Sequence, residues 1–144
     1  MKTKITILLC LCSLSLLAQE EITGSWKGIL TQDRGGFRSK YEFELYLKQD
    51  GDKITGRSYV YIEEIYAEFD LEGYFVDDKT IFFQETKIGQ NKILPGMQWC
   101  IKNGELELKR SGDSQKLEGY WEGHTPTNDC IPGKIFLQRI IPRA

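Results

Sequence analysis

The feature of this sequence that most restricts its fold is an alternation of apolar and polar residues with a period of two, which dominates from Ile22 onward. Its clearest instance is the segment 40–48, where aromatic and leucine residues alternate with lysines and glutamates. A period of two is typical of a β-strand with one buried face, because successive side chains point to opposite sides of a sheet. No useful window has the 3.6-residue apolar period of a helix, so we expect an all-β protein.

The alternating segments are short and closely spaced, which predicts about eight to nine strands. Turn-forming residues separate them, including Asp50-Gly51-Asp52 and the strong hairpin signal Asn103-Gly104. The expected strands cover residues 22–31, 40–48, 54–62, 67–75, 80–88, 97–102, 105–110, 116–122 and 134–141. Short links favour an up-and-down antiparallel meander, and a meander of this size removes its exposed edges by closing into a barrel.

The first 18 residues have a different character. Lys2 and Lys4 precede an apolar run that stops at Ala18, which is the pattern of a secretory signal peptide. The run is shorter than the roughly 20 apolar residues of a membrane-spanning helix. We therefore expect residues 1–18 to be a signal peptide and residues 19–144 to form a single β-barrel domain that is periplasmic or secreted.

Loss of the signal peptide would leave two cysteines, Cys100 and Cys130. An even number of cysteines in an exported chain predicts a disulfide, and two free buried thiols are the alternative. The loss of Lys2 and Lys4 would also change the formal charge from −2 to −4. A mildly acidic chain argues against nucleic acid as a partner. Membrane insertion as a barrel is not expected either, because charged outward side chains such as Glu42 would face lipid.

A short unit recurs in which a glycine on the expected inner face precedes a mostly aromatic residue by two positions. The glycines are Gly24, Gly56, Gly73 and Gly119. One interpretation is mechanical, since an inward glycine lets a strand coil sharply, as a small barrel requires. The other interpretation is that the glycines leave space in the lumen for a ligand, and both can hold together.

At Gly24-Ser25-Trp26 the chain resembles the calycins, the superfamily of lipocalins, fatty-acid-binding proteins and avidins. In lipocalins this G-x-W tryptophan plugs one end of the barrel, and an arginine from the last strand packs over it as a cation on an indole face. The resemblance implies that role for Arg139. The local likeness to the avidin and streptavidin group rests on ITGSW at 22–26 and ITGRS at 54–58, and it covers about the first half of the exported chain.

The biotin site of avidins does not carry over to this sequence. The asparagine and serine of the family's first strand fall at Gly28 and Gln32, its third-strand tyrosine falls at Ser58, and its sixth-strand tryptophan falls near Leu117. The C-terminal half also holds one predicted strand too many for an eight-stranded avidin. The resemblance therefore implies the barrel and disfavours biotin, since a fold alone does not carry a function.

Residues for catalysis or metal binding are sparse. His124 is the only histidine of the chain, and a catalytic triad or a zinc site would need it together with partners that its loop does not supply. No phosphate-binding or dinucleotide-binding motif occurs, and the paired carboxylates fall at turns or on outward faces. We expect no enzyme, no cofactor and no metal site. A haem-ligand role for His124, as in some calycin-like barrels, is the alternative.

Two surfaces could bind a partner. The first is the inner face, where aromatic side chains are expected to converge: Trp26, Tyr41, Phe43, Phe69, Phe75, Trp99 and Trp121. An eight-stranded barrel is just wide enough to be filled by side chains or to hold one small ligand, so a packed core is the alternative. The second is the exterior, where tyrosines can bury a ring and keep a hydroxyl partner, or can reflect strand propensity alone: Tyr46, Tyr59, Tyr61, Tyr66, Tyr74 and Tyr120.

The sequence thus predicts an exported lipocalin-like binding protein that holds a small apolar or amphipathic ligand at one end of the barrel. The alternative is a protein- or glycan-interaction module that uses the tyrosine-bearing exterior and has a solid core. A cavity volume distinguishes the two, because ligand pockets usually exceed about 300 Å³ whereas a solid core has only methyl-sized voids.

Overall fold

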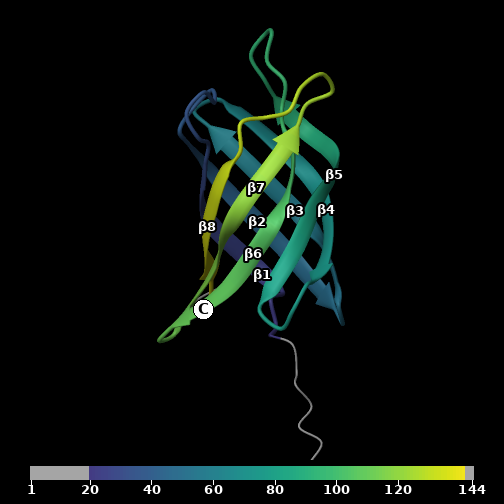
Figure 1. Ribbon diagram of the computed structural model, residues 1–144, viewed down its shortest axis with the longest axis vertical. Coiled ribbons are helices and arrows are strands. Elements are labelled where there is room, and N and C mark those ends of the chain that lie inside the picture. Colours follow the sequence, from purple (N-terminus) through teal and green to yellow (C-terminus); the bar gives the residue numbers. More distant parts are fainter. Residues whose placement is uncertain (1–19, 142–144) are drawn as a thin grey trace, which may run out of the picture.

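The computed structural model describes residues 20–141, which form eight strands and no helix (Figure 1). The predicted signal peptide, residues 1–18, lies outside the described residues. Within the described part of the chain, no helix is long and apolar enough to cross a membrane. The strands are β1 (Gly24–Thr31), β2 (Lys40–Asp50), β3 (Lys53–Ile62), β4 (Ile65–Phe75), β5 (Thr80–Lys92), β6 (Ile101–Ser111), β7 (Ser114–His124) and β8 (Gly133–Ile140).

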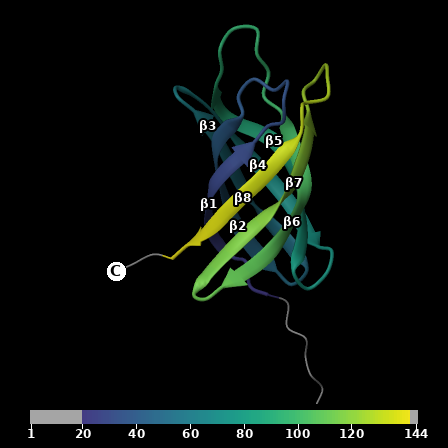
Figure 2. The same cartoon turned by 60° about the vertical axis from the view of Figure 1, so that its left-hand side comes forward.

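Each strand pairs antiparallel with the next, and β1 pairs with β8 to close the barrel (Figure 2). The predicted all-β meander is confirmed, with eight strands. The hairpin predicted at Asn103-Gly104 is wrong, because β6 runs straight through it and Gly104 lies opposite Trp121 of β7. Residues 97–100, predicted as part of a strand, belong to the loop between β5 and β6.

The mechanical interpretation of the inward glycines agrees with the backbone geometry. A Cβ atom at Gly56 would overlap the carbonyl oxygen of Tyr46, and one at Gly119 would overlap that of Glu105. These glycines therefore sit where the backbone of the neighbouring strand approaches too closely for any side chain. Gly24 differs, because no atom lies within 4 Å of its Cβ position and its φ of 140° is one that other residues rarely adopt.

The two ends of the barrel differ. Short turns join β2 to β3, β4 to β5 and β6 to β7 at one end, which we call the closed end. At the other, the open end, longer loops join β1 to β2, β5 to β6 and β7 to β8, beside the short turn from β3 to β4 (Figure 1). At the closed end Trp26 is fully buried and its indole N–H donates to the carbonyl of Ile22 at 3.0 Å. The guanidinium of Arg139 lies 4.7 Å from the indole centroid and donates to the carbonyl of Glu21. The packing of Arg139 over Trp26 expected from the sequence is confirmed.

The barrel wall changes between β5 and β6. These two strands pair only from Thr80 to Gln84 on β5, opposite Asn103 to Glu107 on β6. Beyond Gln84, β5 continues to pair with β4 through two irregularities in register and no longer follows β6. Over the half of the barrel nearer the open end, β5 and β6 therefore have no strand pairing between them. We call this gap in the pairing the seam.

Candidate functional site

The open end contains a cavity of about 230 Å³. Its walls come from the inner faces of the strands and from the loops that join β1 to β2, β5 to β6 and β7 to β8. Most of the lining is apolar, and it includes Leu30, Tyr41, Val60, Ile65, Trp99 and Trp121. The volume lies just below the range of about 300–1,000 Å³ that holds drug-sized ligands and far above a methyl-sized void. The cavity is thus suited to a molecule smaller than a typical drug.

The structure divides the aromatic residues that the sequence grouped on the inner face. Tyr41 and Trp121 line the cavity from β2 and β7, and Trp99 lines it from the loop before β6. The others do not line the cavity: Trp26, Phe43 and Phe69 are fully buried in the core, and Phe75 packs against the core with part of its surface exposed. The middle and closed end of the barrel are therefore filled by side chains, and the open space is confined to the open end.

Hydrogen bonds fix the orientation of the aromatic walls. The hydroxyl of Tyr41 donates to the Gln32 side-chain oxygen at 3.1 Å, and burial raises the pKa of this phenol. The indole N–H of Trp121 donates to the carbonyl of Thr31 at 2.8 Å. The indole nitrogen of Trp99, by contrast, is buried without a hydrogen-bond partner among the described residues.

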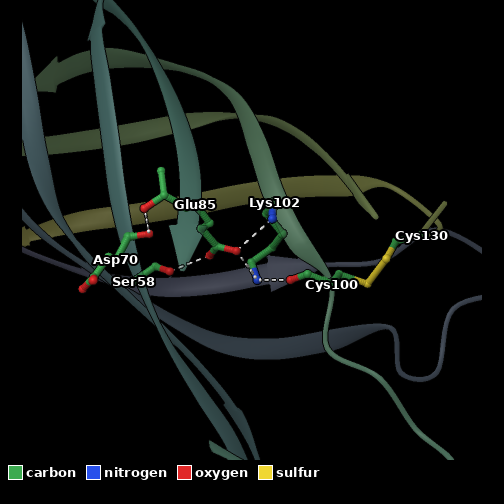
Figure 3. Close-up of polar contacts among 7 residues, drawn as sticks. Ser58, Asp70, Glu85, Cys100, Lys102 and Cys130 are labelled. Carbon is green, nitrogen blue, oxygen red and sulfur yellow. Dashed lines mark hydrogen bonds and ion pairs between the residues drawn. A yellow bond between two sulfur atoms is a disulfide. The ribbon is translucent and has the colours of Figure 1, made fainter. Parts of the chain in front are cut away.

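A buried ion pair joins Glu85 to Lys102, and Lys102 is one of the residues that line the cavity (Figure 3). The ammonium of Lys102 is 3.0 Å from a carboxylate oxygen of Glu85, and their side chains are 3% and 0% exposed. The same oxygen accepts the backbone N–H of Lys102 at 2.8 Å, and the other accepts the hydroxyl of Ser58 at 2.5 Å. The ammonium also donates to the carbonyl of Cys100 at 3.0 Å and lies 4.3 Å from the ring centroid of Phe69.

This pair occupies the seam between β5 and β6. The Glu85 carboxylate accepts a backbone N–H of β6 at the point where β5 has left the ladder, so it replaces a strand-to-strand hydrogen bond. Burial lowers the pKa of Lys102 and raises that of Glu85, and the attraction between them opposes both shifts. Burying two charges is costly even when they are paired, and removal of either partner would leave the other as an uncompensated buried charge.

Glu85 and Lys102 are not among the site residues predicted from the sequence. A signal for both existed in the period of two, because Glu85 continues the inward series of Ile81 and Phe83, and Lys102 shares the inward parity of Leu106. A charged residue at a position that the pattern assigns to the core is informative, since such residues are rarely buried unless paired.

The predicted disulfide between Cys100 and Cys130 is confirmed, with a Cα–Cα separation of 6.3 Å. It joins the loop before β6 to the loop before β8, and both cysteines line the cavity. The disulfide therefore holds two walls of the open end together. A structural disulfide of this kind forms and persists in an oxidising compartment.

Comparison with known proteins adds no assignment to this geometry. No family model, curated protein or solved structure matches this chain. The fold is therefore assigned from the strand pairing, and a function has to be argued from the chemistry of the open end.

His124 lies outside the cavity. It ends β7, is exposed to solvent and forms an isolated backbone bridge with Asp129. Among residues 20–141, no group of three histidine, cysteine or acidic side chains converges so as to hold a metal ion.

The exterior tyrosines point outward as the alternation predicts. Tyr120 is the most exposed, at 69%, and the ammonium of Lys134 lies 5.4 Å from its ring centroid. Tyr74 is half exposed and contacts Phe82 of β5 with ring centroids 5.2 Å apart. Glu105 of β6 pairs with both Phe82 and Tyr120, so these aromatic residues lie in one row across β4 to β7.

Proposed function

We propose that this protein is an exported binding protein of the calycin type that holds a small apolar or amphipathic ligand at the open end of its barrel. The observation that supports this most directly is the cavity of about 230 Å³ at the end opposite Trp26 and Arg139. One plugged end and one hollow end is the arrangement that the resemblance to lipocalins implies. The Cys100–Cys130 disulfide and the predicted signal peptide support a periplasmic or secreted location.

The lining defines the ligand chemistry. Leu30, Val60 and Ile65 offer apolar contacts, and the rim adds polar groups from Gln98 and Asp129. Ligand sites of this kind combine a mainly apolar wall with a few polar groups that orient the ligand. The ligand that fits is a small, largely apolar molecule with at most one polar end.

The test is binding of small apolar probes, with toluene, styrene, indole and octanol as the panel. A probe at ten times its Kd stabilises the folded state by about 1.4 kcal/mol, so we expect a visible rise in melting temperature. Binding should also alter tryptophan fluorescence, because Trp99 and Trp121 line the cavity. The proposal fails if none of the four probes produces either effect.

A cavity-filling variant locates the site. Val60→Phe adds volume to a buried residue that lines the cavity, so it should abolish probe binding while the barrel still folds. The matched control is Ile140→Phe, which makes a similar addition at a residue 43% exposed. Retained probe binding in Val60→Phe would place the binding elsewhere and contradict the proposal.

A second candidate is docking of a protein or a glycan on the exterior. The row formed by Tyr74, Phe82 and Tyr120 supports it, because exposed aromatic rings are enriched in recognition surfaces. We expect the double variant Tyr74→Ala/Tyr120→Ala to fold normally and to lose any co-sedimentation with insoluble peptidoglycan or chitin. If the unmodified protein sediments with neither polymer, the glycan form of this candidate is excluded.

A further inference from the structure

We propose that the side-chain amine of Lys102 captures small aldehydes or ketones in the cavity as an imine, with Glu85 as its proton acceptor and counterion. The inference rests on the proposed function, because it concerns the same cavity, and it assigns a chemical class to the ligand. Among the described residues that line the cavity, Lys102 is the only cation.

The burial of Lys102 favours a neutral, reactive amine, because its side chain is only 3% exposed. The ring of Phe69 lies 4.3 Å from the nitrogen and, as a cation–π partner, favours the ammonium instead. An amine attacks a carbonyl only when it is deprotonated, and desolvation in an apolar site is how proteins make a lysine nucleophilic. Burial is the main cause of the lowered pKa of Lys102, and Glu85 opposes it in part.

Glu85 is placed to receive the proton that the ammonium must lose. One of its oxygens is 3.0 Å from the Lys102 nitrogen, and burial raises the pKa of the carboxyl, which makes it a better acceptor. The hydroxyl of Ser58 holds the other oxygen, so the first stays directed at Lys102. Figure 3 shows this chain of contacts from Ser58 through Glu85 to Lys102.

The reaction balances without an oxidant or a reductant. The ammonium passes a proton to the Glu85 carboxylate, and the free amine forms a C–N bond to the carbonyl carbon of the ligand. The carbonyl oxygen takes up one proton from the attacking nitrogen and one from the Glu85 carboxyl and leaves as one water molecule, which gives the protonated imine. A protonated imine then carries the positive charge that Lys102 had before, and the Glu85 carboxylate neutralises it.

A structural role for the pair and a reactive one differ in what they predict. A pair that only closes the seam between β5 and β6 would leave the amine unreactive, because it would stay protonated. A reactive amine would be modified faster than an exposed lysine. Each unit by which a lysine pKa is lowered raises the fraction of free amine at neutral pH about tenfold.

The test is reductive trapping on the full-length exported protein. Benzaldehyde with sodium cyanoborohydride at neutral pH converts an imine into a stable benzyl-lysine, which peptide mass mapping locates. We expect Lys102 to be labelled severalfold faster than Lys134, an exposed lysine that also lies beside an aromatic ring. Styrene has nearly the shape of benzaldehyde and no carbonyl, so it should protect Lys102 and leave the labelling of Lys134 unchanged.

The outcomes separate this proposal from the proposed function. If styrene binds in the cavity and Lys102 is not labelled faster than Lys134, the imine proposal is overturned and the binding function stands. If Lys102 is labelled and styrene gives no protection, the reaction does not occur in the cavity and the proposal is also overturned. Lys102→Met should lose the fast label, and the wild-type mapping decides the question even if that variant does not fold.

Discussion

Removing the indole of Trp26 tests the architecture of the closed end. Its side chain is fully buried, its N–H donates to Ile22, and Arg139 covers its face. Truncation of a buried tryptophan to alanine costs about 3–5 kcal/mol. Trp26→Ala should lie near the upper limit, because the carbonyl of Ile22 also loses its partner and the cation loses its aromatic contact. Since domains of this size are stable by about 5–15 kcal/mol, this one change removes much of the total.

Two further variants separate the contributions to this loss of stability. Trp26→Phe keeps most of the buried apolar volume and loses the N–H, so we expect a cost of about 1–2 kcal/mol. Arg139→Ala removes the cation from the indole face and should cost about 0.5–2 kcal/mol. The matched control is Tyr120→Ala, which truncates a mainly exposed ring and should change the stability by about 0.5 kcal/mol or less.

The assay is thermal and urea unfolding of the oxidised protein followed by circular dichroism. One kcal/mol corresponds to about 3–6 °C in a domain of this size, so Trp26→Ala should melt roughly 15–25 °C lower or be unfolded. A shift of only a degree or two, equal to that of Tyr120→Ala, would mean that Trp26 does not plug the barrel. The interpretation of the closed end would then be wrong.

Three further changes test other parts of the barrel. Replacing both Cys100 and Cys130 by serine should lower the free energy of unfolding by about 3–4 kcal/mol, because the disulfide closes a loop of 30 residues; an unchanged urea midpoint would contradict this. Gly56→Ala should cost about 1–3 kcal/mol because its Cβ would overlap a backbone carbonyl, whereas Gly89→Ala, with no atom closer than 3.6 Å to its Cβ, should be nearly neutral; equal melting shifts would refute the steric argument. A hydrogen bond to a neighbouring glutamate raises the pKa of Tyr46 to about 12, so the folded chain holds this proton more tightly and stability should fall as the pH rises from about 10 to 12; Tyr46→Phe should reduce that slope in melts over this range, and an unaltered slope would exclude the effect.

Much of the fold was predictable because the period of two reports directly which residues face inward. In β2 the alternation is so regular that both the strand and its buried face follow from the sequence. The hairpin prediction at Asn103-Gly104 is wrong because the same dipeptide suits both a hairpin turn and a sharply coiled strand. In β6, Gly104 serves the second purpose, since a Cβ there would overlap the carbonyl oxygen of Tyr120.

The site was less predictable because alternation gives the face of a residue and not its depth along the barrel axis. Tyr41 and Phe43 are neighbours on the inner face of β2, yet one lines the cavity and the other lies in the packed core. The difference depends on strand tilt and register, which the sequence pattern does not contain. The pairing of Glu85 with Lys102 likewise depends on where β5 leaves β6, and no local signal marks that point.

The closure of β1 onto β8 also sets the order in which this protein can fold. Contacts at that junction, such as the hydrogen bond from the Lys134 backbone to the Thr31 hydroxyl, join residues 103 positions apart. Such distant pairing has a large loop-closure entropy and forms slowly, on the millisecond-to-second scale of other β-rich domains. Until β8 docks, β1 and β7 each present an unpaired edge that can recruit another chain. The protein is therefore most prone to aggregation before its last strand docks. A chaperone that shields strand edges would have its greatest effect at that stage.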